Sequence, residues 1–199
     1  DDIVDGSVTS TITVAINDGS SDDNFDAVAD QTVSVTTTDD DVAGFTIAET
    51  EGSTGVDESG STDIFTVVLN AEPSSNVVLD ITSSDTGEAT VTSSLTFTAA
   101  NWDTAQNVTV TGVDDHIIDG TQNTTVTVSV LDAASDDDFD AVADQTVSVT
   151  TTDDDVAGFT IAETEGSTGV DESGSTDIFT VVLNAEPVSY THLRAHETV

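Results

Sequence analysis

Three adjacent carboxylates occur twice in the sequence, each time within the same ten-residue stretch. The first copy is Asp39, Asp40 and Asp41, and the second is Asp153, Asp154 and Asp155. Each triplet closes one strand-like segment and precedes the next, so it stands at a candidate seam between domains. Ca²⁺ takes about six to eight oxygen ligands from carboxylates and backbone carbonyls on flexible loops. We therefore interpret both triplets as candidate parts of a calcium site.

The balance of charge excludes several classes of partner. The chain has 40 acidic residues against a single Lys or Arg, a formal net charge of −39. Nothing is available to neutralise phosphates, which excludes nucleic acid, and an anionic membrane surface is equally disfavoured. No apolar run approaches the roughly 18 residues that span a bilayer, so we expect no membrane insertion. Because Cys is absent and His is sparse, zinc and copper are not expected.

An internal repeat of 114 residues organises the chain. Residues 21–73 and 135–187 match without a gap and differ only at Asn24, which is Asp138 in the second copy. We therefore predict four segments: 1–41 is the back part of one repeat, 42–155 is a complete repeat, 156–187 is the front of a third, and 188–199 is a non-native tail.

The last twelve residues depart from the repeat. After Pro187 the repeat predicts Ser-Ser-Asn-Val-Val, but the chain continues Val-Ser-Tyr-Thr-His-Leu-Arg-Ala-His-Glu-Thr-Val. This stretch holds the only Tyr and the only Arg of the chain. It resembles a translated sequencing adapter of the kind found in metagenomic reads, and the alternative is a true C-terminus. We leave it out of the fold prediction.

Alternation of apolar and polar residues with period two marks strands throughout the complete repeat. Phe65, Val67 and Leu69 fall on one face of such a segment, and Thr alternates with Val in several others. The pattern predicts an all-β fold, an immunoglobulin-like antiparallel β-sandwich in which each sheet buries one face. The seven expected strands cover residues 44–48, 63–69, 77–82, 89–92, 95–98 resuming at 107–113 after Trp102, 123–131 and 146–151.

If these strands alternate in direction, four acidic segments reach the same end of the sandwich. Two carboxylates about 6 Å apart repel by roughly 0.7 kcal/mol even at the dielectric constant of bulk water. The repeat has no Lys or Arg to offset this repulsion, so we expect a bound cation there. The segments carry Glu49, Glu51, Asp57 and Glu58; Asp85 and Glu88; Asp114, Asp115 and Asp119; and Asp153, Asp154 and Asp155.

A simpler interpretation of these loops stays open at this point. Asp in a turn bonds to its own backbone, and surplus acidity keeps a protein soluble in salt. His116 stands where the first repeat has Asp2, so we expect its side chain to point to solvent instead of binding an ion. Trp102, the only Trp, is expected to cap the core.

The complete repeat resembles a Calx-beta domain. The resemblance rests on Leu95-Thr96-Phe97-Thr98, Gln106-Asn107-Val108-Thr109-Val110, Val113-Asp114-Asp115 and Asp119-Gly120, with Val56-Asp57-Glu58-Ser59-Gly60 similar to the opening segment of that family. Membership would imply a β-sandwich that binds Ca²⁺ through acidic loops at one end, as in the regulatory domains of sodium–calcium exchangers. The family also occurs in large bacterial surface and adhesion proteins.

Carried over to matching positions, the resemblance implies a set of calcium ligands. The set comprises Asp114, Asp115, Asp119, Asp153, Asp154 and Asp155, with Glu51 or Glu58 and Asp85 beside them. The family often has Glu and further acids after the Asp pair, whereas Asp119-Gly120-Thr121-Gln122 follows here. This departure leaves the number and affinity of the ions open.

We therefore expect a calcium-binding structural or adhesive repeat of a large secreted or cell-surface bacterial protein, in which calcium stiffens the seams between neighbouring repeats. The alternative is a sandwich that binds carbohydrate or another cell-surface or matrix ligand, with acidity serving only solubility. That function needs an exposed aromatic platform, and the repeat offers Trp102 alone. Catalysis is not expected, because the paired carboxylates that could hydrolyse glycosides lie in loops without an evident cleft.

Overall fold

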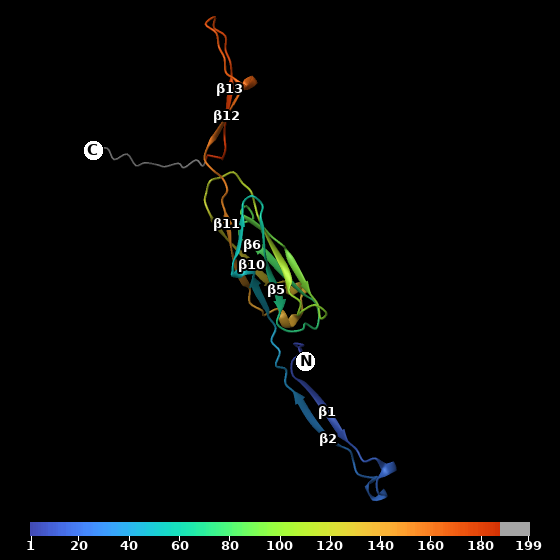
Figure 1. Cartoon of the computed structure of the whole chain (residues 1–199). Helices are drawn as coiled ribbons and strands as arrows, with labels where there is room; N and C mark the ends of the chain where they lie inside the picture. The colour runs from blue at the N-terminus through green and yellow to red at the C-terminus, as the bar shows by residue number, and fades with distance from the viewer. Residues whose placement is uncertain (188–199) are drawn as a thin grey trace, which may run out of the picture.

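The computed structural model describes residues 1–187, so the prediction of a non-native tail at 188–199 lies outside the described residues. Figure 1 shows a β-sandwich at the centre of an elongated chain, with a two-stranded hairpin projecting from each end. None of the helices in the described part of the chain is long and apolar enough to cross a membrane.

Two sheets form the sandwich. The first contains, in spatial order, β4 (Thr54–Asp57), β11 (Gln145–Thr152), β10 (Gln122–Val130), β6 (Val77–Ser83) and β8 (Ser94–Phe97). The second contains β3 (Phe45–Glu49), β5 (Thr62–Leu69), β9 (Gln106–Gly112) and β7 (Ala89–Val91). Strand pairs are antiparallel apart from β4 and β11, which run parallel. The predicted all-β, antiparallel sandwich is confirmed.

The core lies between the sheets because each strand turns its apolar residues inward. Along β5, Phe65, Val67 and Leu69 are buried, whereas the residues between them are half-buried on the outer face. Phe97 and Phe139 are fully buried from the other side of the core. Each such side chain contributes about 1.5–3 kcal/mol through removal from water, so this alternation is sufficient to fix which face of each strand is internal.

The sandwich has nine strands within residues 45–152, two more than predicted. The expected single strand over 95–98 and 107–113 is wrong, because β8 and β9 belong to different sheets. The chain crosses between the sheets at a turn that Asn101 holds, its side-chain oxygen accepting from Thr98 N at 2.6 Å. Trp102 is half-buried beside this turn and packs against the core, as expected. The second missed strand is β4, which is too short to show a period of two.

The two projecting hairpins repeat parts of the sandwich at the 114-residue offset. β1 (Val8–Val14) and β2 (Gln31–Thr37) correspond to β10 and β11. β12 (Phe159–Glu163) and β13 (Phe179–Leu183) correspond to β3 and β5. Residues that are internal in the sandwich are open here: Phe159 is 63% exposed, whereas Phe45 at the same repeat position is 3% exposed.

The same short contact joins the sandwich to each hairpin. On one side Asp2 O accepts from Glu72 N at 2.7 Å, and Val4 N donates to Glu72 O at 3.3 Å. On the other side His116 O accepts from Glu186 N, and Ile117 forms a parallel bridge to the same residue. His116 lies 114 positions after Asp2, and Glu186 lies 114 positions after Glu72, so the geometry of the junction repeats with the sequence.

Candidate metal centre

The carboxylate of Glu58 is buried at one end of the sandwich. Glu58 directly follows β4, and its backbone N donates to Thr152 O at 3.1 Å, which continues the pairing of β4 with β11. Gly112 makes this approach possible, since a Cβ on Gly112 would lie 2.0 Å from Asp57 O. The Glu58 side chain is 1% exposed.

Asp153 and Asp155 complete a compact group of three carboxylates. Asp153 Oδ1 accepts from Asp155 N at 2.8 Å, and Asp153 Oδ2 accepts from Gly120 N at 2.8 Å. These bonds fold the segment after β11 back over the loop that connects β9 to β10. Carboxylate oxygens of Glu58, Asp153 and Asp155 then lie within 4.8 Å of one another.

Two of these carboxylates have an oxygen that is buried and lacks a hydrogen-bond partner among the described residues, Oε2 of Glu58 and Oδ2 of Asp155. Burial, with the nearby charges of Asp153 and Asp115, raises the pKa of Glu58 to about 7. Burial also raises the pKa of Asp155, as does the charge of Asp153, while His116 opposes the shift. A metal-free site of this kind is electrostatically unfavourable at neutral pH.

This donor set fits a hard divalent cation. Three carboxylates within reach of one another supply oxygen ligands alone, which suits Ca²⁺ and offers nothing to a thiophilic metal. The two orphaned oxygens are the acceptors that a bound cation would satisfy. If calcium is bound, Glu58, Asp153 and Asp155 would hold it, and its charge would offset the repulsion among them.

Other predicted ligands lie around this group. Asp115 is half-buried, and its Oδ1 accepts from Ile117 N at 2.7 Å. Asp119 is exposed, and its charge raises the pKa of Glu58. Asp85 is exposed at the connection from β6 to β7, where its Oδ1 accepts from Gly87 N at 2.9 Å. Asp114 and Asp154 are exposed and lie outside the three-carboxylate group.

Glu51 is placed elsewhere. It lies in the short turn η3 (Thr50–Gly52), before β4, whereas Glu58 follows β4. Because Thr54 pairs with Val149 and Asp57 with Thr152, the two glutamates lie toward opposite ends of β4. The resemblance implied either Glu51 or Glu58 as a ligand, and of these two Glu58 is the residue that lies at the acidic end. His116 is exposed there, as expected.

Asp39, Asp40 and Asp41 form part of the same arrangement between β2 and β3. Asp39 Oδ1 accepts from Asp41 N at 2.9 Å, and its Oδ2 accepts from Gly6 N at 2.7 Å, as Asp153 does with Asp155 and Gly120. Burial and the neighbouring charge of Asp39 raise the pKa of Asp41. Among the described residues, this copy has no counterpart of Glu58.

Glu88 is the residue that the predicted ligand set missed. Its Oε2 is buried and unpartnered within the described chain. Burial, and then the charges of Asp119 and Asp85, raise the pKa of Glu88. The sequence places Glu88 in an acidic connection but holds no signal that its side chain turns inward, since it stands immediately before a three-residue strand.

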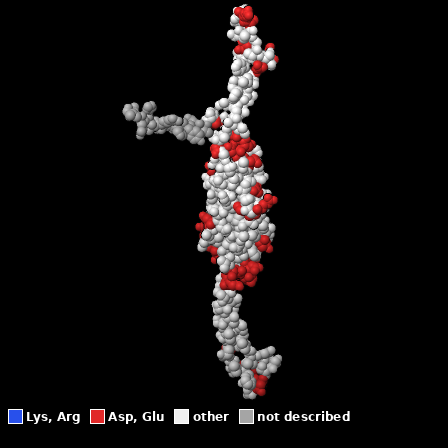
Figure 2. Space-filling view, turned by 60° about the vertical axis from the view of Figure 1, so that its left-hand side comes forward, with Lys and Arg blue, Asp and Glu red and all other residues white. Residues whose placement is uncertain are grey.

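On the face drawn in Figure 2, acidic residues gather at both ends of the sandwich, with smaller groups along its flanks. At the end opposite Glu58, the buried Asp136 has partners. Its Oδ2 accepts from Ser74 Oγ at 2.8 Å and Ser75 N at 2.7 Å. Despite its burial, these bonds hold the pKa of Asp136 below its usual range. This carboxylate joins two loops through hydrogen bonds, which compensate its burial without a bound cation.

No family model matches the chain, and no curated protein matches it. Among solved structures, the apo-form Calx CBD1 domain is 14% identical, covers 58% of this chain and 100% of its own, and has a TM-score of 0.42. CBD12 from CALX1.2 is 11% identical, with 70% and 69% covered and a TM-score of 0.40. Domains 4 and 5 of the S-layer protein SbsC are 22% identical, with 73% and 66% covered and a TM-score of 0.41.

Proposed function

We propose that the chain is a calcium-binding structural module, repeated in a large secreted or cell-surface bacterial protein. The observation that carries the proposal is the buried Oε2 of Glu58, which has no hydrogen-bond partner within residues 1–187 and belongs to a carboxylate grouped with those of Asp153 and Asp155. An unpartnered buried carboxylate is costly unless a cation compensates it. The chain has one Lys or Arg in 199 residues, so a metal ion is the available compensation.

Calcium at this centre would stiffen the seam between repeats. Asp115 and Asp119, on the loop after β9, lie close enough to the centre for their charges to raise the pKa of Glu58, while His116 and Ile117 of the same loop contact Glu186 of the following segment. One short loop therefore faces the metal centre on one side and the next repeat on the other. Ordering the loop by metal binding would fix the position of the next repeat, so the partners in this function are neighbouring repeats of the same chain.

A location outside the cell fits this chemistry. Extracellular calcium modules work with dissociation constants of about 10⁻⁴–10⁻³ M, because calcium is abundant there. Glu58 is buried but Asp153 and Asp155 are half-buried, so the three-carboxylate group is partly open to solvent, which suits such an exchangeable site. A target for adhesion is not needed for the structural role.

The proposal is tested by thermal unfolding of the full chain in millimolar CaCl₂, in MgCl₂ and with a chelator. Because calcium would bind the folded state alone, it should raise the unfolding midpoint. At a calcium concentration 100 times the dissociation constant, the free energy of unfolding should increase by about 2.7 kcal/mol. Mg²⁺ should do less, because it demands near-ideal octahedral geometry. An identical midpoint in all three solutions would rule the proposal out.

A further inference from the structure

One edge of β11 is open over half of its length. β10 covers its other edge from Gln145 to Thr151, whereas β4 pairs only with Val149–Thr152. The reason is local: Glu51 and Gly52 have φ angles of 58° and 82°, which turn the chain out of the line of β4. Among the described residues, no strand pairs with residues 145–148 on this edge.

Within residues 1–187, the backbone groups on this edge of residues 145–148 have no pairing strand. Glu58 N bonds to Thr152 O, so the backbone of Thr152 faces the β4 side. Backbone groups alternate along a strand, which directs the N–H and C=O of Ser148 and Thr146 to the same side. Proteins usually protect such an edge with Lys, Pro or a bulge, and residues 145–148 (Gln-Thr-Val-Ser) contain none of the protecting residues.

The edge lies in a groove of about 650 Å³ between the two sheets. Ile47 of β3 and Val147 of β11 supply its apolar lining. Gln145 bounds the groove at one end, where its Nε2 donates to Phe45 O at 2.7 Å. At the other end Thr54 Oγ1 donates to Glu49 Oε1 at 3.2 Å. These two hydrogen bonds bound an open groove beside residues 145–148 of β11.

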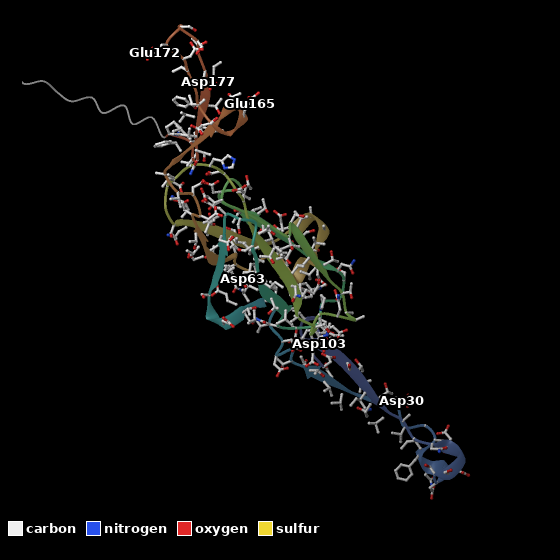
Figure 3. The ribbon with its side chains drawn as sticks, turned by 45° about the horizontal axis from the view of Figure 1, so that its top comes forward. Asp30, Asp63, Asp103, Glu165, Glu172 and Asp177 are labelled. Atoms are coloured by element: carbon white, nitrogen blue, oxygen red, sulfur yellow. The ribbon has the colours of Figure 1, made fainter. Side chains whose placement is uncertain are left out.

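The negative charge beside the groove favours a positively charged occupant. Glu49 lines the groove and the exposed Glu51 stands in the adjoining turn. Asp63 lies close by, since its Oδ2 accepts from Gly55 N at 2.9 Å, and Figure 3 shows it on the flank of the sandwich, away from the ends. No Lys or Arg occurs within residues 1–187, so the groove attracts a basic segment and repels another copy of this acidic chain.

We propose that the open edge of β11 binds an extended basic segment of another protein as an added β-strand. The segment pairs with the backbone of Thr146 and Ser148 and places an apolar side chain against Ile47, with Lys or Arg directed toward Glu49 and Glu51. Backbone pairing supplies the binding and the flanking side chains supply the selectivity. The site is independent of the metal centre, because residues 145–148 lie at the other end of β11 from Asp153.

Binding by one repeat is expected to be weak, because only four residues of edge are free. The same Gln-Thr-Val-Ser sequence recurs at 31–34, so a tandem array offers one such edge in each complete repeat. Simultaneous engagement of several edges by a partner with repeated basic segments raises the apparent affinity without any new contact.

The test uses the full chain and a fluorescent blocked peptide, Lys-Thr-Val-Thr-Lys, titrated by anisotropy in calcium and in chelator. One control peptide, Lys-Thr-Pro-Thr-Lys, keeps the charge but cannot pair along its length, and a second, Glu-Thr-Val-Thr-Glu, reverses the charge. The basic pairing peptide should bind at least fivefold more tightly than either control, with and without calcium. Equal binding of the proline peptide would show simple charge attraction and overturn the proposal.

Two further measurements locate the site. Thr146→Pro removes an edge N–H without removing a bond to β10, so it should fold and weaken peptide binding at least fivefold, whereas the sequence-matched control Thr32→Pro should not. Amide exchange of the unmodified chain decides the matter if Thr146→Pro does not fold. The amides of Thr146 and Ser148 should exchange rapidly in the free chain and slowly with the peptide, and an unchanged exchange rate would contradict the proposal.

Discussion

The backbone N of Glu58 donates to Thr152 O at 3.1 Å, although 94 positions separate the two residues in the sequence. This bond extends the parallel pairing of β4 and β11 by one residue and brings Glu58 beside Asp153. The metal centre therefore depends on a strand of four residues, which carries the Glu58 side chain from the edge of the sandwich to its acidic end. Disturbing that pairing should disturb the centre.

Gly112→Ala should weaken both folding and calcium binding. The new methyl group would lie 2.0 Å from Asp57 O, so either β4 or the end of β9 must shift. We expect a loss of about 1–3 kcal/mol, typical of overpacking, and a weaker calcium response in thermal unfolding. Gly55→Ala is the matched control on β4, because its methyl group would meet Thr150 O at an ordinary 3.7 Å. Equal effects of the two substitutions would contradict the role of Gly112.

The pH dependence of the metal-free protein should have an unusual sign between pH 4.5 and 7. The pKa of Glu58 is about 7 in the folded chain against an ordinary 4.5, so the folded state binds the extra proton in this window. The stability that protonation of Glu58 contributes is therefore fully present near pH 4.5 and is lost as the pH rises toward 7. The unfolding midpoint of the chelated chain should fall over this range relative to Glu58→Gln, by several degrees.

Calcium should reverse that trend, because the ion binds the ionised carboxylate. The calcium-induced rise in the midpoint should grow from pH 5 to pH 8. A calcium response that is the same at pH 5 and pH 8 would show that Glu58 does not bind the ion.

Asp136→Ala should destabilise the sandwich without changing its calcium response. The substitution leaves Ser74 Oγ and Ser75 N without their buried acceptor at the end away from Glu58. We expect a loss of about 1–3 kcal/mol of unfolding free energy, measured by denaturant titration. Asp22→Ala is its repeat-matched control: Asp22 is exposed and, in the described part of the chain, accepts only from Asn24, so the loss of stability should be within about 0.5 kcal/mol. A changed calcium response in Asp136→Ala would show that the two ends are coupled.

The sequence predicted the sandwich because its strands alternate in a way that two half-buried sheets require. Phe65, Val67 and Leu69 show the inner face of β5 directly. The crossing from β8 to β9 could not be predicted, since the alternation on either side of Trp102 is the same whether the chain stays in one sheet or changes sheets. β4 was missed because four residues, one of them Gly55, carry too little pattern.

The positions of some residues at the acidic end could be predicted from their spacing in the sequence, and the positions of others could not. The loops around Asp115, Asp119 and Asp153 follow or precede clear strands, so their common end could be inferred. The choice between Glu51 and Glu58 depends on the course of β4, and the inward turn of Glu88 depends on packing around a three-residue strand. Neither is encoded in residue type or periodicity. Burial, not the number of carboxylates, is what singles out Glu58.

The most direct test of the central claim is calcium titration calorimetry on the full chain and two isosteric variants. Glu58→Gln removes the buried charge, whereas Glu172→Gln removes the same residue from the same sequence context in the open hairpin, where Figure 3 shows Glu172 far from the sandwich. We predict that Glu58→Gln weakens binding at the tightest site at least tenfold while leaving the metal-free chain at least as stable, and that Glu172→Gln changes neither. Undiminished calcium binding in Glu58→Gln would contradict the proposed metal centre.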